Sequence, residues 1–203
     1  MFMNDQTRDT YNKVAKEWVE NHWTYEEEKD LNLIPHLKLF IELVDGKDKV
    51  VLDLGSGGGR DSKYLHDHGI NVIGVDYSTG MLEEARKRNP EIEFLEMDMR
   101  KLTFANNNFD GVWACASLLH LKKEELPIAL AEIKRVLKLG GILFAAVKEW
   151  SDNLAKPDKY GQRFFAYYKL DEFQEKIAES GFKILDSGVN NWHWIHVFAR
   201  AEK

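Results

Sequence analysis

Apolar residues near the start of the chain recur at intervals of three or four, as in a helix with one buried face. The spacing runs from Tyr11 to Trp23 and again from Leu33 to Val44, where Pro35 fits a first helical turn. Two amphipathic helices are therefore predicted ahead of the first strand. We expect residues 1–46 to form a helical extension that acts as a lid.

From residue 47 the pattern changes to short, continuously apolar runs that alternate with helical segments. The runs that predict strands lie at 49–54, 71–76, 92–98, 109–115 and 141–147. Between them, one helix is expected to begin after Ser78, and another to end at Gly140 or Gly141. Continuously apolar strands separated by helices indicate a parallel sheet covered on both faces. Residues 47–148 are therefore predicted to form a doubly wound α/β core.

The end of the chain departs from this strict alternation. After a helix predicted at 171–180 come two strand-like runs, FKILDSG and WHWIHVFAR, with a two-residue turn expected between them. Trp192, Trp194 and Phe198 alternate along the second run and are expected in the core. Residues 149–203 are thus predicted to add a roof insertion, a terminal helix and a β-hairpin to a single domain.

The amino-acid composition of the chain limits which kinds of binding partner are expected. The chain has 203 residues, of which 44% are hydrophobic and 31% charged, and its net charge is −6, the balance of an ordinary globular domain. It contains no apolar run near the length of about 20 residues that a membrane helix needs, no secretory signal, and one cysteine. We expect a cytoplasmic protein without a membrane or nucleic-acid partner.

The stretch VVLDLGSGGGRDS places a cluster of glycines directly after the first predicted strand. The fingerprint of dinucleotide sites requires a third glycine at the position that Arg60 occupies here. The residues instead fit an acid followed by alternate glycines, namely Asp53, Gly55, Gly57 and Gly59. A nicotinamide oxidoreductase is therefore disfavoured.

Polar residues also stand at the ends of the next two predicted strands. Asp76 ends the second strand, and its carboxylate can accept hydrogen bonds from both hydroxyls of a ribose. Asp98 and Met99 end the third strand, where one can receive an amino group and the other can pack against a purine. Because parallel strand ends open on one edge of the sheet, these side chains are expected to share one ligand site.

In sheet order, five segments resemble the motifs of class I S-adenosylmethionine-dependent methyltransferases. They read VLDLGSGGGR, GVDYS, EMDM, FDGVWACASLLHL and EIKRVLKLGGILF. The resemblance implies a Rossmann-like, doubly wound, seven-stranded sheet with an antiparallel last strand. It also implies that S-adenosylmethionine is the methyl donor and S-adenosylhomocysteine the product. No NPPY-type motif follows the fourth strand, and ACASLLHL instead resembles family members that act on small molecules, which implies a small-molecule acceptor.

The resemblance implies a donor site made of Asp53, Gly55, Gly57, Gly59, Arg60, Asp76, Tyr77, Asp98, Met99, Cys115 and Ala116. The glycines would let the backbone approach the methionine part, and Tyr77 would pack beside adenine. Arg60 would either meet the donor carboxylate or form an ion pair on its helix surface.

On the acceptor side, His120 is the candidate general base, with packing or a hydrogen bond at a helix start as the alternative. His193 and His196 are three residues apart on a predicted strand. They would therefore point to opposite faces, so we expect no metal site.

The segments VKEWSDN and GQRFFAYYKLDEF resemble the roof of a subgroup of small bacterial methyltransferases. The candidate substrate residues are Tyr11, Glu149, Trp150, Arg163, Tyr167 and Tyr168. Tyr11 and Trp18 are either lid aromatics or core positions of their helix. An acidic, aromatic roof predicts a cationic or planar acceptor.

The sequence therefore predicts a monomeric or weakly dimeric methyltransferase that acts on a small molecule. The alternative is a non-catalytic module that binds S-adenosylmethionine for regulation.

Overall fold

A computed structural model describes residues 3–25, 33–45, 48–149 and 159–202, with side chains from residue 6 onward. The helices are α1 (Met3–His22), α2 (Leu33–Val44), α3 (Arg60–Asp67), α4 (Thr79–Arg88), α5 (Leu126–Val136) and α6 (Leu170–Glu179), with a short 3-10 helix η1 (Leu118–His120). The strands are β1 (Val50–Leu54), β2 (Asn71–Asp76), β3 (Glu93–Glu96), β4 (Phe109–Cys115), β5 (Leu137–Lys148), β6 (Phe182–Val189) and β7 (Trp194–Ala201).

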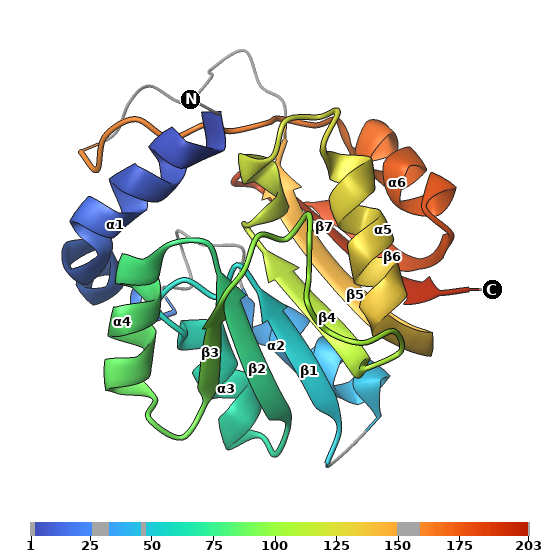
Figure 1. Ribbon diagram of the computed structural model, residues 1–203. Coiled ribbons are helices and arrows are strands. Elements are labelled where there is room, and N and C mark those ends of the chain that lie inside the picture. Colours follow the sequence, from blue (N-terminus) through green and yellow to red (C-terminus); the bar gives the residue numbers. More distant parts are fainter. Residues whose placement is uncertain (1–2, 26–32, 46–47, 150–158, 203) are drawn as a thin grey trace.

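One seven-stranded sheet runs through the molecule in the order β3-β2-β1-β4-β5-β7-β6 (Figure 1). Strands β1 to β5 pair in parallel, and β7 runs antiparallel to both of its neighbours, β5 and β6. This topology confirms the predicted doubly wound sheet with an antiparallel last strand. Its order reverses at β1, which is where ligands bind in such sheets.

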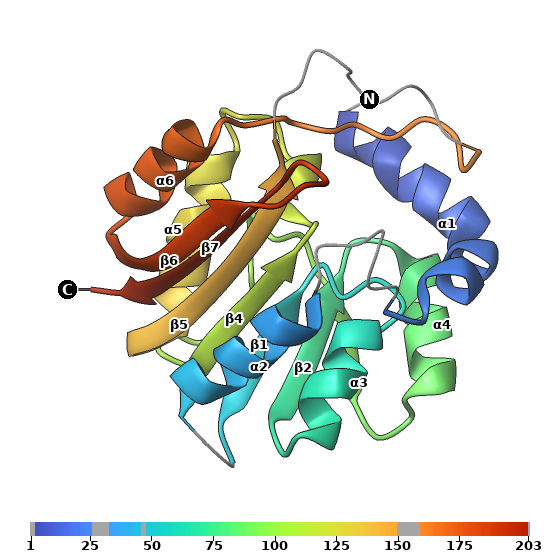
Figure 2. The same cartoon turned by 180° about the vertical axis from the view of Figure 1, so that it is seen from behind.

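Helices cover both faces of the sheet (Figures 1 and 2). Side chains of α2, α3 and α4 form one buried cluster with the sheet, and side chains of α5 and α6 form the other. On the first face, Trp113 is fully buried and stacks on Phe144 with ring centroids 3.9 Å apart. Phe40 of α2 meets Trp113 edge-on at 5.2 Å and is itself fully buried.

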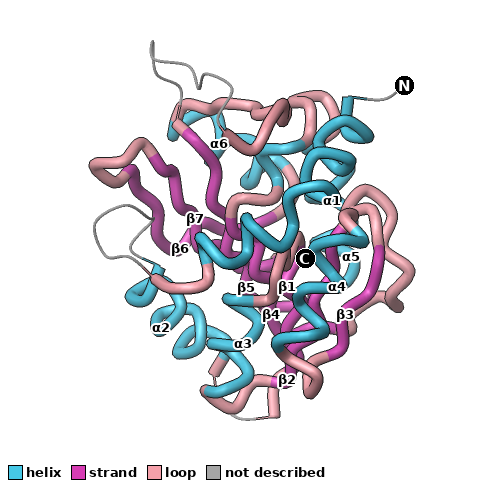
Figure 3. The backbone as a smooth tube through the Cα atoms, turned by 90° about the vertical axis from the view of Figure 1, so that its left-hand side faces the viewer, coloured by secondary structure: helices cyan, strands magenta, loops and turns pink. Residues whose placement is uncertain are grey.

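The predicted lid of residues 1–46 is therefore too long. Helix α2 is a core helix, because burying its apolar side chains against β4 and β5 removes them from water. Helix α1 alone stands outside both large clusters. It packs against α4 through Ala15, Val19 and Met81, beyond the carboxyl ends of the strands (Figures 1 and 3).

Three boundaries differ from those expected. Helix α5 ends at Val136 and β5 begins at Leu137, well before the expected start at 141, because Leu137 already pairs with Phe109. Strand β3 ends at Glu96, so Asp98 lies in the loop beyond it. Finally, β6 and β7 are joined by residues 190–193, not by two residues.

The longer β6–β7 loop explains one wrong core assignment. The Asn190 side chain accepts hydrogen bonds from the backbone N–H groups of Trp192 and Trp194, at 2.9 and 3.0 Å, and so organises the loop itself. Trp192 lies in this loop with 51% of its surface exposed, whereas Phe198 is buried as expected.

Candidate donor and acceptor site

A cavity of about 680 Å³ is lined by the carboxyl ends of the central strands, by α1 and by the segment 160–167. Its volume falls within the range of about 300 to 1,000 Å³ that is usual for small-molecule sites. The predicted site residues that line it are Tyr11, Asp53, Gly55, Gly57, Arg60, Asp76, Tyr77, Asp98, Met99, Cys115, Ala116, His120, Arg163 and Tyr167. The structure thus brings most of the expected donor and acceptor residues to one place.

The glycine loop is held by the end of β2. Gly55 and Ser56 both donate backbone hydrogen bonds to the Val75 carbonyl, at 2.8 and 2.9 Å. The Asp76 carboxylate accepts from the Gly57 N–H at 2.9 Å with one oxygen and from the Ser78 N–H at 2.8 Å with the other. Burial raises the pKa of Asp76, and these backbone donors oppose the rise. Asp76 therefore fixes the loop as well as bordering the cavity.

Gly55 and Gly59 need to be glycine for different reasons. Both have positive φ, at 80° and 82°. A Cβ on Gly55 would lie 2.3 Å from the Ser117 Cβ, so the loop can approach the end of β4 only without a side chain. A Cβ on Gly59 would instead meet Asn89 and Phe94, away from the cavity lining. Gly59 does not line the cavity, and its expected contact with the donor stays a prediction.

Two hydroxyl groups in the cavity wall are buried without a hydrogen-bond partner among the described residues. They belong to Ser56 and Ser117. Beside Ser117, Ala116 holds a φ of 54°, which is uncommon for a residue with a Cβ. Orphaned buried polar groups next to a strained backbone are typical of a ligand site. The lining is therefore polar enough to hold a nucleoside with an amino-acid tail.

Helix α1 docks directly on the glycine loop. A Cβ at Gly58 would come within 2.4 Å of a Val19 methyl group, and Trp18 lies over Gly57. The Asn12 side chain accepts from the Gly80 N–H at 3.0 Å, which ties α1 to the start of α4. Sequence reasoning missed Asn12, because a polar residue on an amphipathic helix gives no sign of a partner 68 residues away.

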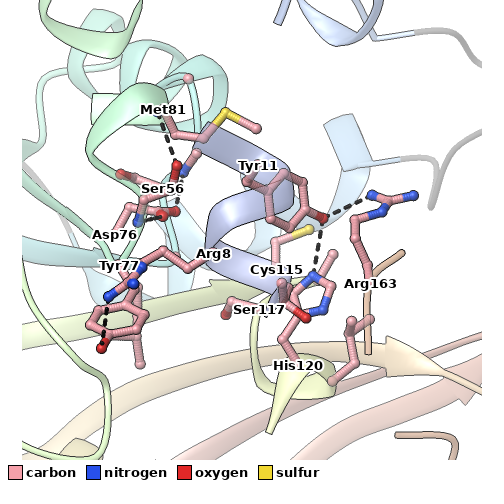
Figure 4. A pocket seen from close by; sticks show the side chains of 18 of the residues that line it. Arg8, Tyr11, Ser56, Asp76, Tyr77, Met81, Cys115, Ser117, His120 and Arg163 are labelled. Carbon is pink, nitrogen blue, oxygen red and sulfur yellow. Dashed lines mark hydrogen bonds between the residues drawn. The ribbon is translucent and has the colours of Figure 1, made fainter. Parts of the chain in front are cut away.

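Arg8 is a second residue of α1 that the sequence did not reveal. Its guanidinium lies 5.0 Å from the centre of the Tyr77 ring and donates a hydrogen bond to the Tyr77 hydroxyl (Figure 4). Tyr77, the predicted neighbour of adenine, is thus contacted by the lid.

Arg60 takes part in the ion pair that was one of its two expected roles. Its Nε donates to Asp61 at 2.9 Å, and its guanidinium lies 4.4 Å from the Tyr25 ring. Asp61 also accepts from the Trp113 indole N–H at 2.9 Å, so the pair is anchored in the core. Arg60 also lines the cavity, and its contact with a donor carboxylate stays a prediction.

Asp98 also forms an ion pair with a neighbouring arginine. Arg100 donates to both carboxylate oxygens of Asp98 from its side chain and reaches Glu125 as well. Although partial burial acts to raise the pKa of Asp98, hydrogen bonds and charge from Arg100 outweigh it and hold that pKa below its usual range. Arg100 was not foreseen, since an arginine two residues after a strand-end acid has no distinctive spacing.

Asp53 is buried, in a position that disfavours the ionised form of its carboxyl group. Burial, reinforced by the Asp61 charge, raises the pKa of Asp53 to about 8, although the Ser62 hydroxyl donates to it. In the unfolded chain this carboxyl ionises near pH 4. Between about pH 4 and pH 8 the folded protein therefore keeps a proton that the unfolded chain loses, and the stability contributed by this group falls as the pH rises.

Replacing Asp53 with asparagine removes this titration while keeping the shape of the side chain. We expect the melting temperature of Asp53→Asn to exceed that of the wild type by more at pH 8 than at pH 5. Thermal melts at the two pH values measure this difference, with the exposed Asp67→Asn as the control. An equal gap at both pH values would contradict the raised pKa.

On the other side of the cavity, three side chains form a hydrogen-bonded chain (Figure 4). Arg163 donates to the Tyr11 hydroxyl at 2.9 Å, and the same hydroxyl lies 3.1 Å from Nε2 of His120. Nδ1 of His120 lies 2.7 Å from the Phe164 carbonyl, which can only accept, so Nδ1 carries the proton and Nε2 accepts from Tyr11. Tyr11, from the lid, thus joins η1 to the roof.

His120 is neutral in this setting. Burial, together with the charge of Arg163, lowers its pKa to about 4, against the opposing hydrogen bond to Phe164. His120 thus makes hydrogen bonds, as in the alternative given for it, and it also lines the cavity. Its part as a base stays a prediction.

Two predicted substrate residues lie elsewhere. Tyr168 is 1% exposed and packs on Phe173 in the core, because its backbone N–H pairs with Lys148 and turns the ring inward. Glu149 lies outside the cavity lining and accepts a hydrogen bond from His193 at 2.8 Å. Trp150 falls outside the described residues.

Two features, a cluster of possible metal ligands and a helix that could cross a membrane, are absent from the described ranges. No three His, Cys, Asp or Glu side chains gather there around a possible ion. His193 pairs with Glu149, whereas His196 pairs with Asp186 at 3.3 Å. None of the helices in these ranges is long and apolar enough to span a bilayer.

Comparison with known proteins places this arrangement among methyltransferases. Residues 51–141 match the methyltransferase domain family. A demethylmenaquinone methyltransferase of Beutenbergia cavernae is 38% identical over 144 residues, which cover 70% of this chain and 58% of that protein. The enzyme of the same name from Renibacterium salmoninarum is 40% identical over 96 residues, covering 47% of this chain and 40% of the relative. The chain thus spans less than two thirds of these relatives.

Solved structures show the same fold over nearly the whole chain. The Burkholderia thailandensis 1,6-didemethyltoxoflavin-N1-methyltransferase, solved with S-adenosylhomocysteine, has a TM-score of 0.75 at 22% identity and covers 98% of this chain and 87% of its own. The cyclase SpnF has a TM-score of 0.76 at 19% identity, covering 97% and 96%. Fold alone therefore does not fix the reaction. The matched domain, the relatives and the glycine-loop site together show that the chain belongs to the class I S-adenosylmethionine-dependent methyltransferase family.

Proposed function

We propose that this protein transfers a methyl group from S-adenosylmethionine to a small molecule, acting as a monomer or weak homodimer. The observation that carries the proposal is one cavity with two different ends. One end has the glycine loop and Asp76, and the other has the Tyr11–His120–Arg163 chain. A regulatory binding module would have no use for a histidine held in a fixed tautomer beside the cavity.

At the donor end, the polar groups match the parts of the ligand. Asp76 would bind the ribose, and Met99 would pack against the adenine. The hydroxyls of Ser56 and Ser117 would meet the amino-acid part, which would satisfy their missing hydrogen bonds. When bound, S-adenosylmethionine supplies a methyl group on a positively charged sulfur.

At the acceptor end, the chain's residues orient the acceptor and take up its proton. Helix α1 lines one side of the cavity, and alignment of the acceptor behind the methyl group would supply much of the acceleration. The proton lost by the acceptor passes to the Tyr11 oxygen, and Tyr11 passes its own proton to Nε2 of His120. Because His120 is a weak base, this transfer occurs only as the acceptor gains positive charge during methylation.

Tyr11→Phe tests this relay, since phenylalanine keeps the ring and removes only the hydroxyl. We expect kcat to fall about 100-fold, with the affinity for S-adenosylhomocysteine nearly unchanged. Tyr64→Phe, on α3 and outside the cavity lining, is the matched control. An unchanged kcat in Tyr11→Phe would remove the relay and leave alignment as the mechanism.

The acceptor class is tested with methyl-labelled S-adenosylmethionine and a bacterial cell extract divided by molecular size. We expect the label in the small-molecule fraction, with no transfer by Asp76→Asn. Label in the protein or RNA fraction would contradict a small acceptor. No transfer to either fraction by protein that binds S-adenosylhomocysteine would favour the regulatory alternative.

A further inference from the structure

The lid supplies a hydrogen-bond acceptor to the first turn of α4, the helix that follows Asp76. The Oδ1 atom of Asn12, on α1, lies 3.0 Å from the Gly80 nitrogen and 2.7 Å from the Ser78 Oγ. Because a backbone N–H can only donate, the Asn12 atom that faces Gly80 is its carbonyl oxygen. The Ser78 oxygen accepts from the Met81 N–H at 3.2 Å, so the Ser78 hydroxyl donates its own proton to Asn12.

This contact completes the N-terminal cap of α4. The first N–H groups of a helix have no partner within the helix, so each needs an acceptor from elsewhere. In α4, the Ser78 side chain serves one of them, and Asn12 serves that of Gly80 from a different helix. The backbones are also close at this point, since a Cβ on Gly80 would lie 2.9 Å from the Asn12 carbonyl oxygen. Asn12 therefore fixes where α1 meets the start of α4.

The same cap is joined to the donor end of the cavity. The Ser78 N–H donates to one carboxylate oxygen of Asp76 at 2.8 Å, and the Gly57 N–H donates to the other at 2.9 Å. Ser78 is only 2% exposed, so its contacts are largely shielded from water. A continuous series of hydrogen bonds thus runs from Asn12 through Ser78 to Asp76 and the glycine loop. A displacement of Ser78 would move the carboxylate that borders the cavity.

Helix α1 also contacts the acceptor end through the residue next to Asn12. Consecutive side chains of a helix point about 100° apart. Tyr11 accordingly reaches His120, at 3.1 Å, while Asn12 reaches the start of α4. One docked position of α1 therefore determines both contacts.

We propose that Asn12 is a positioning residue for the methyl donor. It acts through Ser78 to hold the Asp76 carboxylate where the ribose binds, and it ties this arrangement to the placement of Tyr11. The inference rests on the proposed function, since Asp76 binds the donor only under that function. Because linked equilibria are reciprocal, the bound donor in turn strengthens the docking of α1.

Calorimetry with S-adenosylhomocysteine and with 5′-methylthioadenosine tests the proposal. The second probe carries adenine and ribose but lacks the amino-acid part. We expect Asn12→Ala to weaken both ligands about tenfold, the effect of one lost hydrogen bond. Alanine favours a helix more than asparagine does, so the variant keeps α1. Asn12→Asp retains an acceptor oxygen at the N-terminus of α4 and should recover most of the affinity.

Hydrogen exchange measures the reciprocal effect on the lid. We expect S-adenosylhomocysteine to slow the exchange of the α1 amides of residues 8–14 in the wild type, and to slow it much less in Asn12→Ala. A residue that only stabilised the fold would lower the melting temperature and leave both ligand affinities and this response unchanged.

Thr10→Ala is the matched control, because it also removes one hydrogen bond of α1, the one to the Gln162 carbonyl in the roof. Its affinities for both ligands should equal those of the wild type. Should Asn12→Ala not fold, Asn12→Ser repeats the test, since the serine oxygen stands one bond closer to the backbone.

Two results would overturn the inference while the donor assignment stands. One is a folded Asn12 variant that binds both ligands as the wild type does. The other is a loss confined to S-adenosylhomocysteine, which would mean that Asn12 does not act through Asp76. If the wild type binds neither ligand, the proposed function itself fails, and this inference with it.

Discussion

Asp76→Asn is expected to weaken the binding of S-adenosylhomocysteine about a hundredfold. Each carboxylate oxygen of Asp76 accepts one backbone hydrogen bond, from Gly57 and from Ser78. Asparagine offers a single oxygen, so its NH₂ group must face one of these N–H donors. The loop then shifts, and the ribose loses an acceptor. Losing one charged hydrogen bond and disturbing the loop costs about 3 kcal/mol, which is about a hundredfold in Kd.

Calorimetry with S-adenosylhomocysteine measures this change, and thermal melts establish that the variant is folded. Asp67→Asn is the matched control, because Asp67 forms a surface ion pair with Lys63 and lies outside the cavity. Its affinity should equal that of the wild type. An unchanged affinity in Asp76→Asn would mean that the donor site has been assigned to the wrong strand end.

Gly55→Ala is expected to be the most destabilising substitution in the site. The added methyl group would overlap the Ser117 Cβ, at 2.3 Å, and the residue would have to hold a φ of 80°. Overpacking costs about 1–3 kcal/mol and a left-handed conformation about 1–2 kcal/mol. In a domain of this size the sum lowers the melting temperature by about 10 °C. Moving Ser117 would also abolish donor binding.

Gly140→Ala separates the two contributions. Gly140 has nearly the same φ, 81°, but a Cβ there would meet no atom within 4 Å. Its variant should lose only the conformational part, a fall of about 3 °C, and should bind S-adenosylhomocysteine normally. Equal melting temperatures for the two variants would show that the clash of an added Cβ at Gly55 with Ser117 does not affect the stability of the protein.

The fold was predictable because its signals are local and periodic. Continuously apolar runs located β1, β2 and β4 within a residue or so, and Ser78 caps α4 as expected by accepting from the Met81 N–H. Predictions failed where long-range pairing decides the outcome. Leu137 has the pattern of a helix but pairs with Phe109, so tertiary contacts override the local preference.

The site residues that lie at or shortly after the ends of strands were predictable from the sequence. Asp53, Asp76 and His120 reach the cavity because the topology places them there. Arg8 and Asn12 contact partners that lie more than 60 residues further along the chain, and nothing in their spacing indicates those partners. The sequence also did not indicate which way a side chain points once the chain has left a strand.

The central claim is that the glycine loop and Asp76 bind S-adenosylmethionine and not a nicotinamide dinucleotide. Calorimetry of the purified protein with S-adenosylhomocysteine, alongside NADH, tests it most directly. We predict micromolar binding of S-adenosylhomocysteine, strongly weakened in Asp76→Asn, and no binding of NADH. Binding of NADH without S-adenosylhomocysteine would contradict both the donor assignment and the mechanism built on it.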